Sequence, residues 1–258
     1  MTDSEATMFH KSNSSQFNDH LVQEAKGLEL LRETIQKHQV PYLGIPNIES
    51  VTDEQLVLQK VNGSSWNPQL MKQLGEGLAH LHKIKAPHYG LDEDNYIGLN
   101  PQVNGHFDHW GKFFVEQRLL YQTNLIKDQK VKRMLEEPIL ERKDILETWL
   151  NRHCIHASLV HGDLWSGNVL FDDQGPWLID PAVYYGDREV DLAMTEMFGG
   201  FSESFYDRYD SVYPRTNAYP QKKVIYNLYH YLNHYNLFGG AYLQSCRNLI
   251  DQIQHHLY

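Results

Sequence analysis

Three side chains close together in the sequence have the types and spacing that phosphoryl transfer requires. Asp163 lies in the segment HGDLWSGN, Asn168 ends that segment, and Asp180 lies in the segment IDP twelve residues later. An aspartate can orient a substrate hydroxyl and accept its proton, while amide and carboxylate oxygens can bind the Mg²⁺ ion that accompanies ATP. We therefore predict Asp163 as the catalytic residue and Asn168 and Asp180 as metal ligands.

The surrounding residues predict the elements that hold this site. Residues 168–171 form a predicted strand, and residues 177–179 form a second one after the turn sequence DDQG. The resulting β-hairpin would place Asn168 and Asp180 side by side at its mouth. The same Asp-to-Asn spacing occurs in the catalytic loop of protein kinases, and Gly162 in place of arginine favours small-molecule kinases.

The stretch that follows Asp180 is rich in acidic residues. It reads DPAVYYGDREVD, and Arg188 is its only fixed positive charge. Crowded carboxylates raise one another's pKa unless cations compensate them, so this density favours a bound metal ion. We predict that Asp187 contacts a cationic or polyhydroxyl substrate. Asp191 is predicted to cap the following helix or to brace the backbone of the catalytic loop.

These segments together resemble one enzyme family. HGDLWSGNVLF, IDPAVYYGDREVDLAMTEMFGGF and YNLYHYLNHYNLFGGAYL are similar to sequences of the fructosamine kinase (ketosamine-3-kinase) family, and the resemblance runs from about Lys11 to the C-terminus. That family belongs to the aminoglycoside phosphotransferase and choline kinase superfamily. The resemblance implies an α+β, two-lobed protein-kinase-like fold and ATP- and Mg²⁺-dependent phosphorylation of the sugar 3-hydroxyl of ketosamines, which is a deglycation activity.

The N-terminal part contains two candidates for nucleotide binding. Lys11 matches the phosphate-contacting lysine of the family, and a helix is predicted from Leu21 onward by apolar residues at helical spacing. Glu24 in that helix is the candidate ion-pair partner that holds Lys11 toward the α- and β-phosphates. We expect Glu24 on a different face of the helix from Leu21 and Leu28.

An apolar strand at residues 55–61 is expected to end at the hinge between the lobes. The backbone of Gln59, Lys60 and Val61 would pair with adenine there, and the sequence NGSS then breaks the chain. We therefore predict a small lobe of sheet and helix at residues 1–61. A larger, mainly helical lobe at residues 62–258 would carry the catalytic loop and the metal-binding hairpin.

The glycine-rich loop that covers the phosphates in kinase folds has no counterpart in this sequence. Only ten residues precede Lys11 and none is glycine, so we expect either an N-terminal truncation, with residues 1–6 as the tail of a hairpin, or a protein without its first strand and loop. Two alternatives to ketosamine phosphorylation therefore stay open. One is a kinase for another small hydroxyl compound, such as an aminoglycoside or choline. The other is a non-catalytic nucleotide-binding pseudoenzyme.

The remainder of the large lobe suggests scaffold and substrate contacts. Helices are predicted at residues 70–81 and 110–119, and the motif DEDNYIG at residues 92–98 is expected to form a loop near the cleft. Within the second helix, the sequence EQR is interpreted as scaffold ion pairs of Glu116 and Arg118. Two aromatic side chains are candidates for substrate contact: Trp165 in the catalytic loop and His234 in a late aromatic stretch.

Composition limits the remaining classes. The chain has 258 residues, a net charge of −10 and two cysteines, so we expect neither a nucleic-acid-binding surface nor a disulfide framework. No apolar run approaches the roughly 20 residues needed to span a membrane. We expect a cytoplasmic monomer without a membrane partner, whose substrate is a small-molecule or protein-bound ketosamine.

Overall fold

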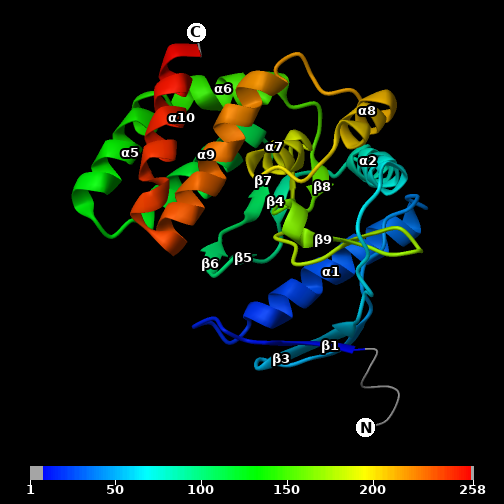
Figure 1. The fold of residues 1–258 in the computed structure, drawn as a ribbon. Helices are drawn as coiled ribbons and strands as arrows, with labels where there is room; N and C mark the ends of the chain where they lie inside the picture. Colours follow the sequence, from blue (N-terminus) through cyan, green and yellow to red (C-terminus); the bar gives the residue numbers. More distant parts are fainter. Residues whose placement is uncertain (1–7, 257–258) are drawn as a thin grey trace.

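The computed structural model describes residues 8–256 and shows a small lobe of sheet and helix below a larger, mainly helical lobe (Figure 1). This is the predicted α+β, two-lobed fold. The predicted hairpin tail at residues 1–6 lies outside the described residues. No helix within residues 8–256 combines the length and apolar character that a membrane crossing needs.

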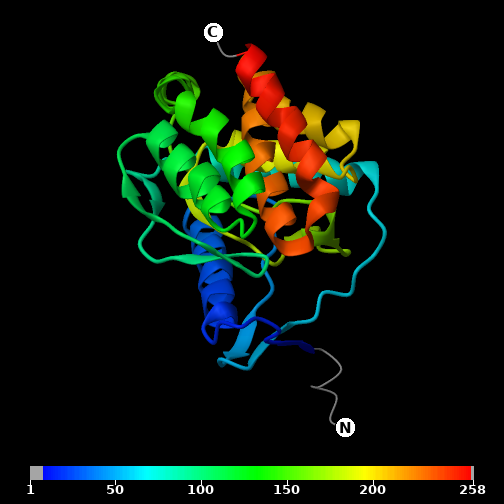
Figure 2. The same ribbon diagram turned by 90° about the vertical axis from the view of Figure 1, so that its left-hand side faces the viewer.

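The small lobe contains an antiparallel sheet of three strands and one long helix. The strands are β1 (Met8–Ser12), β2 (Ile48–Val51) and β3 (Gln55–Gln59), in the order β1-β3-β2. Helix α1 (His20–Lys37) lies between this sheet and the large lobe (Figures 1 and 2). In β3 the side chains of Leu56 and Leu58 are buried toward the helix, as the apolar strand pattern predicts.

The part of the large lobe that the structure describes contains ten α- and π-helical segments. Helix α2 begins at a side-chain cap, because Asn67 Oδ1 accepts the N–H of Leu70 at 2.9 Å. The segments are α2 (Pro68–His82), α3 (Trp110–Phe114), the π-helical η2 (Val115–Leu120), α4 (Tyr121–Asn124), α5 (Gln129–Glu141), α6 (Lys143–His153), α7 (Glu189–Met197), α8 (Glu203–Val212), α9 (Tyr219–Phe238) and α10 (Leu243–His256). Short 3₁₀ turns add η3 (Ser166–Asn168) and η4 (Gly240–Tyr242).

Short strands support the loops between these helices. A four-stranded antiparallel sheet has the order β7-β4-β11-β8, and two separate hairpins flank it. The strands of the sheet are β4 (Tyr89–Leu91), β7 (Gly105–Phe107), β8 (Ser158–Val160) and β11 (Tyr184–Gly186), and the hairpins are β5 (Asn95–Ile97) with β6 (Asn100–Gln102) and β9 (Val169–Phe171) with β10 (Pro176–Leu178). The β9–β10 hairpin confirms the one predicted between Asn168 and Asp180.

Two hydrophobic cores hold the molecule together. One lies within the large lobe and includes Trp110 and Tyr226. The other joins Leu28 of α1 and Leu56 of β3 to residues of α2 and α8 such as Leu74, so it crosses the boundary predicted at residue 61. The hydrophobic packing is therefore continuous across the predicted boundary. The division into lobes at residues 1–61 and 62–258 stays a prediction.

The prediction of scaffold ion pairs for Glu116 and Arg118 is confirmed for Glu116 and wrong for Arg118. Glu116 binds Lys143 Nζ at 2.6 Å, as an ion pair. Arg118 is fully buried, and it has no carboxylate partner among the ion pairs of the described residues. It donates to Val103 O at 2.6 Å and Asn104 Oδ1 at 2.7 Å, and its guanidinium lies 4.1 Å from the ring centre of Tyr184.

Candidate active site

The catalytic loop is held by a buried carboxylate. Asp191, in the first turn of α7, accepts the N–H groups of His161 at 2.7 Å and Gly162 at 2.9 Å, and its Oδ2 lies 3.2 Å from His82 Nε2. Burial acts to raise the pKa of Asp191, but these hydrogen bonds and the neighbouring histidines outweigh it and lower that pKa. The predicted brace on the loop backbone is confirmed.

The same loop explains glycine at position 162. Gly162 has a φ of +82°, and a Cβ atom there would lie 2.0 Å from the carbonyl oxygen of Ala182. Both the backbone conformation and the close approach exclude a side chain, including the arginine found at this position in protein kinases. The backbone thus turns sharply and directs Asp163 into the cleft between the lobes.

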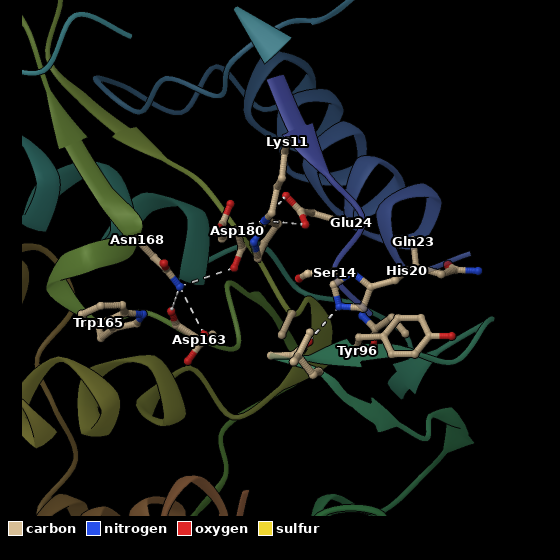
Figure 3. Close-up of a pocket in the computed structure, with 15 residues that line it drawn as sticks. Lys11, Ser14, His20, Gln23, Glu24, Tyr96, Asp163, Trp165, Asn168 and Asp180 are labelled. Carbon is tan, nitrogen blue, oxygen red and sulfur yellow. Dashed lines mark hydrogen bonds and ion pairs between the residues drawn. The ribbon is translucent and has the colours of Figure 1, made fainter. Parts of the chain in front are cut away.

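Asp163 and Asn168 form one hydrogen-bonded unit. Asn168 Nδ2 donates to Asp163 O at 2.8 Å and Asp163 Oδ2 at 3.2 Å, and it lies 3.4 Å from Asp180 O (Figure 3). Burial raises the pKa of Asp163 to about 7, with Asp180 and Asp191 adding to it and the Asn168 bond opposing it. A base with a pKa near the working pH is well suited to accept a hydroxyl proton.

Lys11 links the two lobes at the other side of the cleft. Its Nζ lies 2.8 and 2.9 Å from the two Glu24 oxygens and 3.1 Å from Asp180 Oδ2. Burial acts to lower the pKa of Lys11, but the two carboxylates outweigh it, so the pKa is raised and the ammonium stays charged. The expectation that Glu24 lies on a different helix face from Leu21 and Leu28 is wrong: all three are buried, because residues three and four apart share a side of a helix.

Asp180 has an unusual backbone conformation at the hairpin mouth. Its φ is +52°, in the left-handed region that non-glycine residues seldom adopt and that often marks functional sites. The hairpin ladder continues to this point, since Ile179 N donates to Asn168 O at 3.1 Å. The carboxylate of Asp180 is 43% exposed toward the cleft. With the amide of Asn168 it provides the hard oxygen donors that Mg²⁺ prefers.

A cavity of about 280 Å³ connects these groups (Figure 3). It is lined by six of the predicted residues: Lys11, Glu24, Asp163, Trp165, Asn168 and Asp180. The motif at residues 92–98 was expected near the cleft, and its Asn95, Tyr96 and Gly98 line the cavity. The sequence reasoning did not single out the remaining lining residues, which are Ser14, His20, Gln23, Leu99, Pro181 and Ala182. Nothing in the local sequence marks Ser14 or His20. Ser14 lies in the segment between β1 and α1 and His20 begins α1, so both reach the cavity only through the tertiary placement of the small lobe.

An aromatic patch extends from the cavity along the large lobe. We define it as Trp165, Phe198, His234 and Phe238. The ring centres of Trp165 and Phe198 are 6.4 Å apart, those of Phe198 and His234 are 5.3 Å apart, and those of His234 and Phe238 are 5.6 Å apart. Trp165, Phe198 and Phe238 are 39%, 45% and 65% exposed. Burial lowers the pKa of His234, so the patch is uncharged near neutral pH.

The acidic stretch after Asp180 has a different role from the predicted one. Asp187 is buried, its Oδ2 binds Lys222 Nζ at 2.6 Å and Tyr226 OH at 2.8 Å, and its Oδ1 accepts the N–H of Glu189. It does not line the cavity. The predicted substrate contact of Asp187 is therefore wrong. The argument from acid density to a metal ion fails as well, because Lys222 and Arg188 compensate Asp187 and Glu189, and Asp191 is held by hydrogen bonds.

The predicted hinge residues lie at the end of β3 and do not line the cavity. The N–H of Gln59 donates to Asn47 O at 2.8 Å, and the carbonyl of Val61 accepts the N–H of Gly63 at 3.0 Å. Adenine contact by Gln59, Lys60 and Val61 stays a prediction, and it would have to use the backbone groups that these bonds leave.

The two lobes together define the class of the protein. A lysine–glutamate pair from the small lobe faces an aspartate, an asparagine and a second aspartate from the large lobe, which is the arrangement of protein-kinase-like phosphotransferases. A sequence model described as fructosamine kinase matches residues 1–256. The chain therefore belongs to the fructosamine kinase family.

Individual relatives agree with this assignment. A protein of Vibrio vulnificus, provisionally named a ketoamine kinase, is 38% identical over 98% of this chain and 87% of its own length. A protein-ribulosamine 3-kinase of Arabidopsis thaliana is 40% identical over 69% of this chain and 56% of its own. Among solved structures, a Haemophilus somnus protein with a provisional fructosamine-3-kinase name has a TM-score of 0.83 at 30% identity, covering 96% of this chain and 84% of its own.

More distant structures share the fold alone. A choline/ethanolamine kinase family protein of Mesorhizobium loti has a TM-score of 0.57 at 15% identity and covers 96% of this chain and 85% of its own. This likeness confirms the protein-kinase-like architecture. It says nothing about the acceptor, because unrelated substrates are bound by the same fold.

Proposed function

We propose that this protein is an ATP-dependent ketosamine 3-kinase, which transfers a phosphoryl group to the sugar 3-hydroxyl of fructosamine and ribulosamine adducts. The observation that carries the proposal is Asp163, a carboxylate with its pKa raised to about 7 beside Asn168 in a cavity that also contains Lys11 and Asp180. Membership of the fructosamine kinase family and the names of its relatives, which refer to ketoamines and protein-bound ribulosamine, support the ketosamine acceptor.

The residues of the chain divide the reaction between them. Asp163 would hydrogen-bond the acceptor hydroxyl and take its proton, a role typically worth 10²–10⁴ in rate. Lys11, held by Glu24, would contact the nucleotide phosphates and neutralise charge on them. Asn168 and Asp180 would hold Mg²⁺, which supplies electrostatic stabilisation of the transferring phosphoryl group. Alignment by these fixed groups is expected to matter at least as much as proton removal.

The aromatic patch supports an acceptor that combines a sugar with an amine. Trp165 lines the cavity, and its exposed ring could lie against the apolar face of a sugar. The amine of a ketosamine is cationic near neutral pH, and aromatic faces attract cations. We extend the proposal to Trp165 and His234 as acceptor contacts, with the rest of the patch accommodating the amine substituent.

The test is acceptor-dependent ADP release with Mg²⁺ and ATP. Ribulose-lysine and fructose-lysine would be the ketosamines, glycated peptide would test protein-bound adducts, and kanamycin and choline would be the competing acceptors. Turnover with a ketosamine and a phosphorus NMR signal assigned to the 3-position would support the proposal. Turnover with kanamycin or choline alone would replace it by another small-molecule kinase. ATP binding without turnover on any acceptor would favour a binding-only protein.

A further inference from the structure

A second cluster of metal-binding side chains lies away from the catalytic cavity, at the β4–β7 edge of the large-lobe sheet. His88 precedes β4, Asp92 follows it, and His106 lies in the middle of β7. One potential ligand atom from each side chain lies within 4.8 Å of the other two. None of the three lines the catalytic cavity, so the mechanism proposed above does not use them.

The strand register explains why residues distant in sequence meet here. β4 and β7 pair antiparallel with His106 opposite Gly90, which places it between His88 and Asp92, two residues to either side. At Gly90 the two backbones approach so closely that a Cβ atom would lie 1.8 Å from Gly105 O. The three side chains therefore lie on, or directly beside, two tightly paired strands and not on a free loop.

The side chains already interact with one another. The rings of His88 and His106 have centroids 3.7 Å apart with an interplanar angle of 31°, and His106 Nε2 contacts Asp92 Oδ1. The carboxylate of Asp92 has no lysine or arginine ion-pair partner among the described residues, and its contact there is with the ring of His106. Two imidazoles and one carboxylate form a donor set that transition metals prefer and that suits Mg²⁺ poorly.

We propose that His88, Asp92 and His106 form a binding site for a transition-metal ion such as Zn²⁺. Tetrahedral Zn²⁺ with bonds of about 2.0–2.1 Å requires ligand atoms roughly 3.4 Å apart. The three ligand atoms lie within 4.8 Å of one another, so small rotations would bring them to the ion, and the direct contact between Asp92 and His106 would open to admit it. The side chains of Asp92 and His106 are 81% and 50% exposed, and such side chains can turn without disturbing the core. Solvent would supply the fourth ligand.

The position of the site gives it a connection to the small lobe. Glu93, next to Asp92, binds Lys26 Nζ and accepts from Gln23 Nε2 at 3.3 Å, and both partners lie on α1 beside Glu24. An ion that fixes Asp92 would also restrict the backbone that carries Glu93. Metal binding is therefore expected to slow hydrogen exchange in residues 92–98 as well as in β4 and β7.

The test is calorimetric titration of the full chain with Zn²⁺, with millimolar Mg²⁺ present to occupy the catalytic oxygens. The parent should bind one ion, and His106→Gln and Asp92→Asn should each weaken binding at least about tenfold. His109→Gln is the matched control, because His109 is exposed on the same segment and outside the cluster. Bound Zn²⁺ should raise the melting temperature of the parent and the control but not of the two cluster variants.

The outcomes separate a built site from unspecific binding to the many histidines. Equal affinity in the parent and in His106→Gln would overturn the proposal, as would an equal loss in His109→Gln or the absence of a stoichiometric site in the parent. Melting temperatures without metal show whether each variant is folded. The titration does not depend on turnover, so its result is independent of the proposed kinase activity.

Discussion

Replacing Asp163 by asparagine should lower activity and raise stability in the same protein. Asparagine has the shape of the protonated aspartate but cannot accept a proton, so turnover should fall by about 10²–10⁴. The structure raises the pKa of Asp163 from 3.8 to about 7 because burial penalises the charged carboxylate. Each unit is worth about 1.4 kcal/mol, so removing the charge should stabilise the fold by at most about 4 kcal/mol above pH 7.

The sign of the pH dependence follows from the direction of this shift. A carboxylate whose folded pKa is raised favours the folded state at low pH, and that stability is lost as the pH rises from about 4 through 7. The parent and Asp163→Asn should therefore have similar stability near pH 4 and differ most at pH 8. Denaturant unfolding at both pH values measures the difference.

Activity of the parent provides the second half of this test. Acceptor turnover should fall by about tenfold per unit as the pH decreases below 7, because the base becomes protonated. An aspartate with an ordinary pKa would give no such decrease above pH 5. Activity of Asp163→Asn within about threefold of the parent would refute the base assignment, and a loss of stability at pH 8 would refute the buried-charge reasoning.

Three further substitutions test the parts around Asp163. Lys11→Ala should raise the KM for ATP at least about tenfold and leave the acceptor KM unchanged, since the only substrate groups that Lys11 contacts in the proposed mechanism are nucleotide phosphates. Steady-state kinetics with each substrate varied in turn measure both constants, and a raised acceptor KM would contradict this role. Trp165→Ala should raise the acceptor KM and not the ATP KM, and Trp165→Phe should largely restore the acceptor KM. Trp66→Ala is the control, because Trp66 is also exposed, and equal effects of the two alanine variants would contradict the stacking role. Gly162→Ala should destabilise the fold by about 3 kcal/mol, because its Cβ overlaps Ala182 O at a φ of +82°, and unchanged denaturant unfolding would show that the loop can move.

Much of the geometry of the candidate site was predictable because its residues are close together in the sequence. Asp163, Asn168 and Asp180 lie within 18 residues, and one β-hairpin with an ordinary turn brings them together. The helix at residues 70–81 and the strand at 55–61 followed from apolar spacing in the same way, within a few residues of the observed bounds. The fold class depended on the family resemblance, since local patterns do not specify how two lobes meet.

The failures concern partners that lie far away in the chain. Asp187 looked available for substrate because Lys222, which neutralises it, comes 35 residues later from α9. Glu24 was predicted on a different helix face from Leu21 and Leu28. It lies on the same buried side as these leucines, and from there it binds Lys11. Arg118 was expected to have a carboxylate and instead lies against aromatic rings contributed by three different elements. Local charge density cannot distinguish these cases, because the compensating group is supplied by tertiary structure.

The hydrophobic core that both lobes share predicts how the protein would respond to proteolysis between them. Residues 62–67 are exposed, yet the regions before and after them are joined elsewhere: Gly44 exchanges backbone hydrogen bonds with Pro176 and Leu178, and Gly27 lies against Pro181 and Val183. A protease that cleaved only this segment would sever the peptide chain without separating its two pieces. The fragments would remain a non-covalent pair, and neither could keep its apolar surface buried alone.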